Sequence, residues 1–279
     1  MIRPTLILGS ILVLAACGGG GGGGGGGLSE SLATTQAAYQ IIDLDTGAVR
    51  AAGTVDGLAT DPALRDRYLV LRRLPTRSAV SGQAPGTFAV QPDETPTSSA
   101  QPPCYLAVFE LTRGQWRRLA GDTPWTLVLP ANLAGTGGDD LPACGISHQR
   151  AVAVLAAARA RGLELRLPSD VVWESAARAG YAVFPWGESR DVAVVAGAAV
   201  VAETASVLGP QPVGQRAAAP SGCYDLVGNL AEWTAEGHLR GGSWNDPLGL
   251  ARPANVVVAE SDVPYAQAGL RVTFQPASR

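Results

Sequence analysis

Ten consecutive glycines, Gly18 to Gly27, constrain the fold of this chain more than any other feature. Glycine loses more backbone conformational entropy on ordering than any other residue, and a run of it offers no side chain for packing. This stretch therefore cannot belong to a folded core, and a folded domain has to begin after it. As a flexible chain it spans roughly 17 Å, which predicts a tether.

The residues before the tether have the pattern of a bacterial lipoprotein signal. Arg3 gives a short charged start, an apolar run follows from Leu6 to Ala16, and small residues lead into Cys17. This run is much shorter than the roughly 20 residues of a membrane-spanning helix. We expect residues 1–16 to be removed and Cys17 to be lipidated, because several acyl chains together anchor a protein stably. The alternative is an ordinary secretory signal that contains a cysteine by chance.

The residue after Cys17 bears on the destination of the protein. It is Gly18 rather than an aspartate, which by the sorting convention of Gram-negative bacteria favours the outer membrane. We therefore expect an outer-membrane lipoprotein, on the periplasmic face or the cell surface, that contacts the membrane through its lipid and through the tether of residues 17–27.

Composition narrows the class of protein. Hydrophobic residues make up 46% and charged residues 16% of the chain, with 35 Gly and 20 Pro, so a core can form between many turns. This excludes a disordered chain and a coiled coil. The 21 basic residues are all Arg, they form no concentrated run, and the formal charge is -3. We therefore expect no nucleic-acid partner.

Strand signals come first along the chain. Residues 40–55 contain two short apolar stretches around an Asp-Thr-Gly turn, which is typical of a β-hairpin. Residues 68–74 and 105–111 are apolar strand candidates, and residues 78–103 have the Pro, Ser, Thr and Gly content of a loop.

These signals set the expected domain boundaries. The main domain should occupy residues 65–279. We expect residues 28–64 to form a small N-terminal extension that contains the hairpin.

Three helices are predicted, each with a capping residue before it and a glycine after it. The pairs are Thr112 with Gly121, Ser147 with Gly162, and Ser169 with Gly180. Gln115 completes a capping box with Thr112, and Glu174 and Arg178 are spaced for an ion pair within the third helix. A short strand is expected at 163–167. Helices are few and strands short, so the predicted fold class is α+β.

A series of motifs then resembles, in order and spacing, the formylglycine-generating-enzyme (sulfatase-modifying factor) family. The motifs are Glu110-Leu111-Thr112 with Gln115-Trp116, Arg166-Leu167-Pro168-Ser169-Asp170 with Trp173-Glu174, Ala176-Ala177-Arg178, Phe184-Pro185-Trp186-Gly187, Pro212-Val213-Gly214, Tyr224-Asp225-Leu226-Val227-Gly228-Asn229 with Glu232-Trp233, Leu239-Arg240-Gly241-Gly242-Ser243-Trp244, and Gly269-Leu270-Arg271-Val272. The resemblance covers residues 66–274. It implies a loop-rich, C-type-lectin-like fold with a variable surface in its C-terminal half.

The catalytic chemistry of that family does not carry over. Its oxidases hold copper with two cysteines after the Arg-Gly-Gly-Ser motif, and residues 244–279 contain no cysteine. Thiolates select monovalent copper, so we expect neither copper nor catalytic residues. The related iron-dependent sulfoxide synthases need three histidines, whereas this chain has only His148 and His238, which we expect to be surface or hydrogen-bonded residues. Glu110 and Glu174 are expected to accept bonds from backbone donors.

The resemblance implies one calcium site. Family members bind Ca²⁺ through a side-chain oxygen, two backbone carbonyls and a glutamate, which correspond here to Asp225, the carbonyls of Gly228 and Leu230, and Glu232. Such hard oxygen ligands suit Ca²⁺. The alternative is that the two acids only accept bonds from loop amides. A second calcium loop, expected within residues 190–209, has lost most of its acids.

Three cysteines remain besides Cys17. In an oxidising compartment one disulfide and one free thiol is the simplest arrangement. Cys104 and Cys144 both stand at loop ends, so we favour a bond between them, with Cys223 left over. The sequence alone leaves the other pairings open.

The segment from Trp244 to Ala268 is the candidate ligand surface. It mixes polar and aromatic side chains between two fixed motifs, which is typical of adaptable recognition surfaces. The candidate ligand contacts are Trp244, Asn245, Asp246, Arg252, Asn255, Asp262, Tyr265 and Gln267.

Three functions are compatible with these features. We favour a lipid-anchored ligand-binding or display module, whose residues 245–268 resemble the diversified patch in the variable lipoproteins of diversity-generating retroelements. The first alternative is an active or drifted sulfatase-modifying oxidoreductase. The second is a structural envelope lipoprotein. The ligand can be a protein, a glycan or a small molecule.

Overall fold

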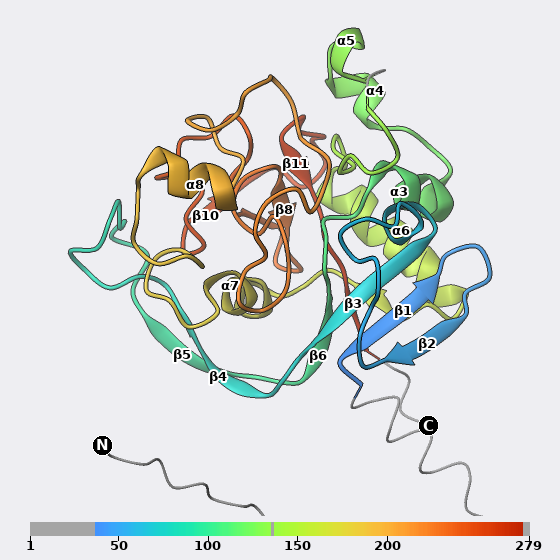
Figure 1. Ribbon diagram of the computed structural model, residues 1–279, viewed down its shortest axis with the longest axis horizontal. Helices are drawn as coiled ribbons and strands as arrows, with labels where there is room; N and C mark the ends of the chain where they lie inside the picture. The colour runs from blue at the N-terminus through green and yellow to red at the C-terminus, as the bar shows by residue number, and fades with distance from the viewer. Residues whose placement is uncertain (1–36, 135–136, 276–279) are drawn as a thin grey trace, which may run out of the picture.

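The computed structural model describes residues 37–134 and 137–275 (Figure 1). The predicted signal peptide, Cys17 and the glycine tether lie outside these residues. The described part is α+β, as predicted, with short helices around three sheets. Within it, no helix has both the length and the apolar character needed to cross a membrane.

The largest sheet has six strands in the order β2-β1-β3-β6-β12-β7. Its strands are β1 (Tyr39–Asp43), β2 (Val49–Ala52), β3 (Tyr68–Leu74), β6 (Cys104–Ala107), β7 (Leu165–Arg166) and β12 (Thr273–Phe274). The expected hairpin is present as β1 and β2, and β1 also pairs with β3. The N-terminal extension therefore shares one sheet with the main domain.

A second sheet, in the order β10-β9-β8-β11, lies in the C-terminal half. It consists of β8 (Ala231–Trp233), β9 (His238–Arg240), β10 (Val256–Val258) and β11 (Ala268–Gly269). β11 runs parallel to β8, and the other pairs are antiparallel. Trp233, Arg240 of the Arg-Gly-Gly motif and Gly269 of the Gly-Leu-Arg motif therefore lie on neighbouring strands of one sheet.

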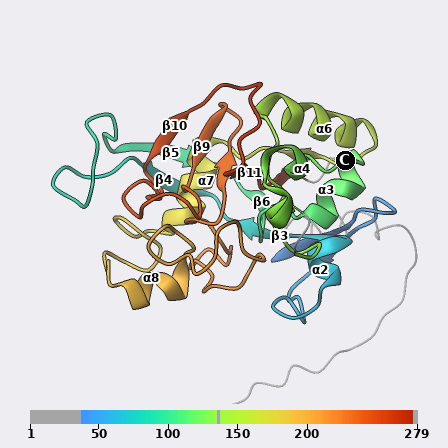
Figure 2. The ribbon, with the colours of Figure 1, turned by 90° about the horizontal axis from the view of Figure 1, so that it is seen from above.

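The loop predicted for residues 78–103 is wrong at its two ends. β4 (Arg77–Ser81) and β5 (Thr97–Gln101) form a two-stranded antiparallel ribbon there. Most of its side chains are small, polar and exposed, so backbone pairing rather than an apolar pattern defines the strands. The intervening loop projects from the molecule in both views (Figures 1 and 2).

The three predicted helices are confirmed with their caps. α3 (Arg113–Ala120) has the Thr112–Gln115 capping box, and Ser147 and Ser169 cap α6 (His148–Ala160) and α7 (Asp170–Arg178). Ala179, not Gly180, is the first left-handed residue after α7. The other helices of the described residues are α2 (Ala63–Asp66), α4 (Trp125–Val128), α5 (Ala131–Ala134) and α8 (Val192–Ala198).

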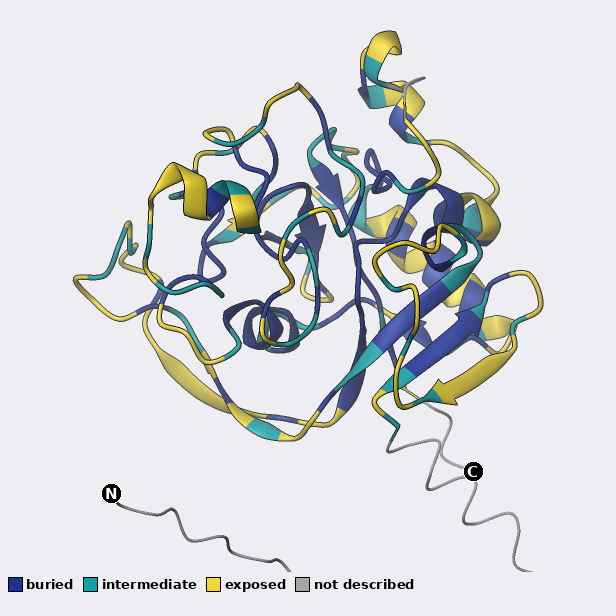
Figure 3. Cartoon of the chain, viewed as in Figure 1, coloured by how far each residue is buried: buried dark blue, intermediate teal, exposed yellow. Residues whose placement is uncertain are grey.

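Tryptophans of the motifs pack in the core. Trp116, Trp173 and Trp233 are fully buried, and Trp244 is 8% exposed. Burial is concentrated in the central strands of the large sheet and in α7, whereas β5 and α8 are mainly exposed (Figure 3). The four-stranded sheet packs against this core through Trp233 and Leu239.

Candidate ligand-binding site

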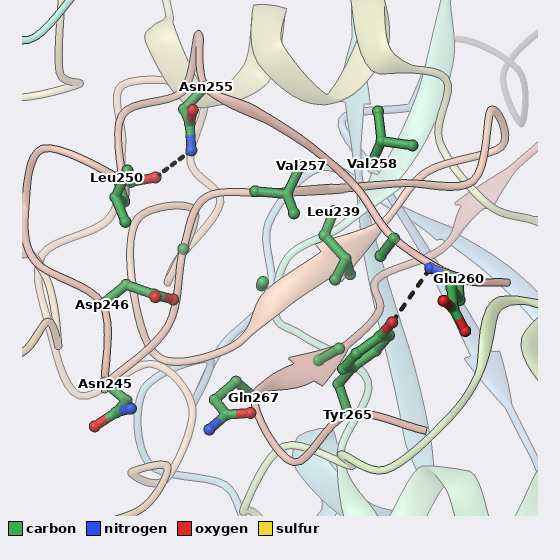
Figure 4. A pocket seen from close by; sticks show the side chains of 14 residues that line it. Leu239, Asn245, Asp246, Leu250, Asn255, Val257, Val258, Glu260, Tyr265 and Gln267 are labelled. Carbon is green, nitrogen blue, oxygen red and sulfur yellow. Dashed lines mark hydrogen bonds between the residues drawn. The ribbon is translucent and has the colours of Figure 1, made fainter. Parts of the chain in front are cut away.

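A pocket with a volume of about 450 Å³ opens on one face of the four-stranded sheet (Figure 4). Its floor is apolar and comes from all four strands: Val257 on β10, Leu239 on β9, Ala231 on β8 and Ala268 on β11. Val257 pairs directly with Leu239, and Ala231 with Ala268, so the members of each pair share a face of the sheet. Trp233 pairs with Leu239 and extends this face into the core.

Polar side chains from the loops surround the floor. Five of the eight candidate ligand contacts line the pocket: Asn245, Asp246, Asn255, Tyr265 and Gln267. They come from both ends and, with Asn255, from the middle of the candidate segment, which folds back so that residues about 20 positions apart face one cavity (Figure 4). An apolar floor with a few polar groups is the usual make-up of a small-ligand site.

The other three candidates lie elsewhere. Trp244 packs in the main core cluster, and Arg252 is completely buried in an ion pair with Glu94. Asp262 is exposed but does not line the pocket. Trp244 and Arg252 are therefore placed to support the site and not to form its wall.

The glycine pair of the Arg-Gly-Gly motif allows the chain to turn at the pocket. Gly242 lines the pocket with φ +64°, and a Cβ there would lie 2.7 Å from the Cα of Ala251. Gly241 has φ +86°, and a Cβ there would lie 2.9 Å from the ring of Trp173. A residue with a Cβ at either position would clash with these neighbours, so only glycine fits this path.

Hydrogen bonds fix several polar groups of the wall. Oδ2 of Asp246 accepts from the backbone N–H and the hydroxyl of Ser243, at 2.8 and 2.7 Å. The amide of Asn255 donates to the carbonyl of Leu250, and its oxygen accepts from Gln91, both at 2.8 Å. Such bonds hold the wall in one geometry before a ligand arrives, which lowers the entropic cost of binding.

The sequence interpretation missed the apolar and one of the acidic lining residues. These are Ala231, Leu239, Leu250, Val257, Val258, Ala259, Ala268 and Glu260. A signal was present, because Val256-Val257-Val258 is a run of β-branched residues inside an otherwise polar segment. Val258, which lines the pocket, is 82% exposed.

Buried ion pairs support the opposite face of the sheet. Arg240 donates to Asp170 at 2.8 Å and to Glu174 at 3.1 Å, and Glu174 also pairs with Arg178 as predicted. Burial would raise the pKa of Asp170, but Arg240 and His238 outweigh it and lower that pKa overall. Burial raises the pKa of Glu174 despite its two arginines.

The two histidines are hydrogen-bonded. His148 contacts the carbonyl of Thr234 at 3.1 Å, and His238 contacts Asp170 at 2.7 Å. Glu110 and Glu174 accept hydrogen bonds from backbone donors, as expected. Glu110 accepts from the backbone N–H of Leu230 at 2.9 Å, and Glu174 from that of Gly82 at 2.8 Å.

The carboxylates of the expected calcium loop have protein partners. Both oxygens of Glu232 accept from Arg271 at 2.6 Å, and one also accepts from the indole N–H of Trp173. Oδ2 of Asp225 accepts from Gly214 at 2.6 Å. Across the described residues no cluster of three or more acids, cysteines or histidines is arranged to hold a metal. Asp225 and Glu232 thus each accept hydrogen bonds from protein donors, and the calcium site stays a prediction.

Glu110 lies close to the two acids of this loop, Asp225 and Glu232, and all three are buried. Burial raises the pKa of Glu110 well above its usual value, and the neighbouring Asp225 and Glu232 raise it further. Burial also raises the pKa of Asp225 to about 6, although Gly214 and Arg271 act against this shift.

The three described cysteines are free and buried. Cys104 shares a core cluster with Cys223, whereas Cys144 belongs to a different one. The expected Cys104–Cys144 bond is thus not formed in the structure, because the two thiols pack in separate parts of the core. Burial raises the pKa of Cys104 and of Cys144 to about 11.

Comparisons with known proteins agree on the family. A family model described as a sulfatase-modifying factor enzyme 1-like domain matches residues 74–275. PvdO from Pseudomonas aeruginosa is 20% identical with a TM-score of 0.63, and the match covers 75% of this chain and 95% of that one. Treponema denticola variable protein 1 is 17% identical with a TM-score of 0.64, covering 75% and 96%.

A third similar structure is CarF, at 17% identity and a TM-score of 0.51, covering 73% of this chain and 100% of CarF. At these identities the three structures show the fold alone, which is the C-type-lectin-like fold of this family. No curated protein matches the chain.

Proposed function

The chain belongs to the family of sulfatase-modifying factor enzyme 1-like domains, and from this premise we propose that it is a lipid-anchored ligand-binding module. The pocket on the four-stranded sheet is its binding site. Ligand contacts come from the loops of residues 245–268, and the ion pairs beneath the sheet keep these loops in place.

One observation carries this proposal: all four strands and both ends of the candidate segment converge on one apolar-floored pocket. Its volume of about 450 Å³ lies in the range of small-ligand sites, roughly 300 to 1,000 Å³. The loops that form it are joined to a buried base, an arrangement that allows loop sequences to vary without loss of the fold.

Two further points support a binding role. The sequence from Trp244 to Arg279 lacks the cysteine pair that the family's oxidases use. One similar structure is described as a variable protein. We include in the proposal that residues 245–268 are diversified in this chain too.

The anchor completes the proposal. Cys17 would carry the lipid, and the glycine run would hold the domain off the outer membrane by roughly 17 Å. A binding module on such a tether can search a volume around its attachment point, which suits capture of a ligand at the envelope.

A fragment screen against the purified full chain tests the binding role. We expect hits that raise the melting temperature of the parent protein and lose this effect in Asn245→Ala/Gln267→Ala, which removes two polar wall groups. The matched control is Asp262→Ala, which changes an exposed residue of the same segment outside the pocket. Hits that bind the wall variant and the parent equally would contradict the proposed site.

A further inference from the structure

The charged side chains that line the pocket are all negative. They are Asp246 and Glu260, and the described lining includes no arginine or histidine. The whole chain contains no lysine, so that residue contributes no positive charge either. The fixed charge of the wall therefore has one sign.

Neither of these acids is neutralised by a partner. Among the described ion pairs none involves Asp246 or Glu260, and only Oδ2 of Asp246 is held, by Ser243. The buried acids nearby are different, since Glu94 pairs with Arg252 and Glu232 with Arg271. The arginines of this region are thus engaged beneath the site, and the carboxylates within it are left without a counter-charge.

The two acids stand on opposite sides of the apolar floor. Figure 4 shows Asp246 and Glu260 apart, with Leu239 and Val257 between them and Tyr265 next to Glu260. The backbone N–H of Glu260 donates to the hydroxyl of Tyr265 at 3.2 Å, which fixes the aromatic ring at this edge. An apolar surface bordered by carboxylates complements a molecule with an apolar body and a positive head.

We propose that the pocket binds an amphiphilic cation, meaning an organic ligand with an apolar body and an ammonium or guanidinium head. The body would cover Leu239 and Val257 against Tyr265, and the head would donate to Glu260 or to Asp246. Charge-assisted hydrogen bonds to carboxylates are about twice as strong as neutral ones, and a ligand carboxylate would be repelled by the same wall. This inference rests on the proposed binding function and names the ligand class for it.

Three probes with one shared body test the proposal: phenethylamine, 2-phenylethanol and 3-phenylpropionate. Their affinities for the full chain in non-ionic detergent are measured by calorimetry, with detergent alone as the blank. We expect the amine to bind about tenfold more tightly than the alcohol, the acid to bind most weakly, and the preference to shrink at high salt. In Glu260→Gln and Asp246→Asn the preference should fall, while Asp262→Asn should keep it.

The possible outcomes separate this inference from the proposed function. Equal binding of all three probes, or tighter binding of the acid, would overturn the cation preference and leave the pocket as a binding site. A preference that Asp262→Asn reduces as much as the two lining variants would also overturn it, because the charge effect would then not be local. Binding of none of the probes would overturn the cation inference, and hits in the fragment screen would then show that the pocket still binds other ligands.

Discussion

Arg252 and Glu94, which are 158 positions apart in the sequence, form a buried bidentate ion pair with N–O distances of 2.6 and 2.8 Å. Arg252 also donates to Gln83 and to the carbonyl of Gly249. Its side chain is completely buried and that of Glu94 is 4% exposed. The pair therefore joins the pocket loop to the loop between β4 and β5.

Truncation of Arg252 should destabilise the domain strongly. Arg252→Ala leaves the carboxylate of Glu94 buried without a partner, which costs about 3–5 kcal/mol of unfolding free energy. The control is Arg166→Ala, whose pair with Glu164 is largely exposed and should contribute at most about 1 kcal/mol. Urea unfolding of both variants measures the difference, and equal small losses would show that the Arg252 pair does not hold the loops.

Stability should depend on the protonation of Asp225. Because burial raises its pKa to about 6, the folded state binds more protons than the unfolded state between roughly pH 4 and this value. This residue therefore reduces stability as the pH rises through that window, by up to about 3 kcal/mol.

Asp225→Asn should remove this contribution. Asparagine tolerates the left-handed backbone at this position (φ +55°) and can still accept from Gly214. Melting curves from pH 4 to pH 7 should show a gain in stability for the variant at pH 7 and little change at pH 4. A parent and a variant with parallel pH profiles would contradict the raised pKa.

The calcium site implied by the resemblance has a direct test. An ion held by Asp225, Glu232 and the carbonyls of Gly228 and Leu230 would raise the melting temperature when CaCl₂ is added to chelator-treated protein. Asp225→Ala should abolish this rise, because it removes one of two carboxylates. An unchanged melting temperature of the parent protein would show that Arg271 is the only cation that Glu232 binds.

Diversification predicts where natural variation lies. Sequencing the 3′ end of the gene deeply across a growing population and sister isolates should show changes concentrated in codons 245–268, with the flanking motif codons constant. An invariant segment would remove the retroelement interpretation and leave a module with a fixed ligand.

Much of the fold could be predicted, because local rules govern it. The caps at Thr112, Ser147 and Ser169 satisfy backbone donors within a few residues, so they are visible in sequence. The ribbon of β4 and β5 was missed because its strands are held by backbone pairing between small polar residues, which leaves no apolar periodicity.

The site was predicted in part for a similar reason. Asn245 and Gln267 could be predicted as ligand contacts because they lie between two motifs. Leu239 lines the pocket because it pairs with Val257 in the sheet, and the sequence does not show this pairing. The burial of Arg252 depends on Glu94, which is far away in sequence and lies in a segment whose composition predicts a loop. Register and long-range pairing are tertiary properties that a single sequence does not display.

The central claim is that ligands bind on the four-stranded sheet, and amide chemical-shift mapping of a screening hit on the full chain tests it most directly. We predict that the largest shifts fall on Val257, Tyr265 and Gln267 and that the amides of β4 and β5 stay unchanged. Shifts concentrated away from the four-stranded sheet would contradict this account.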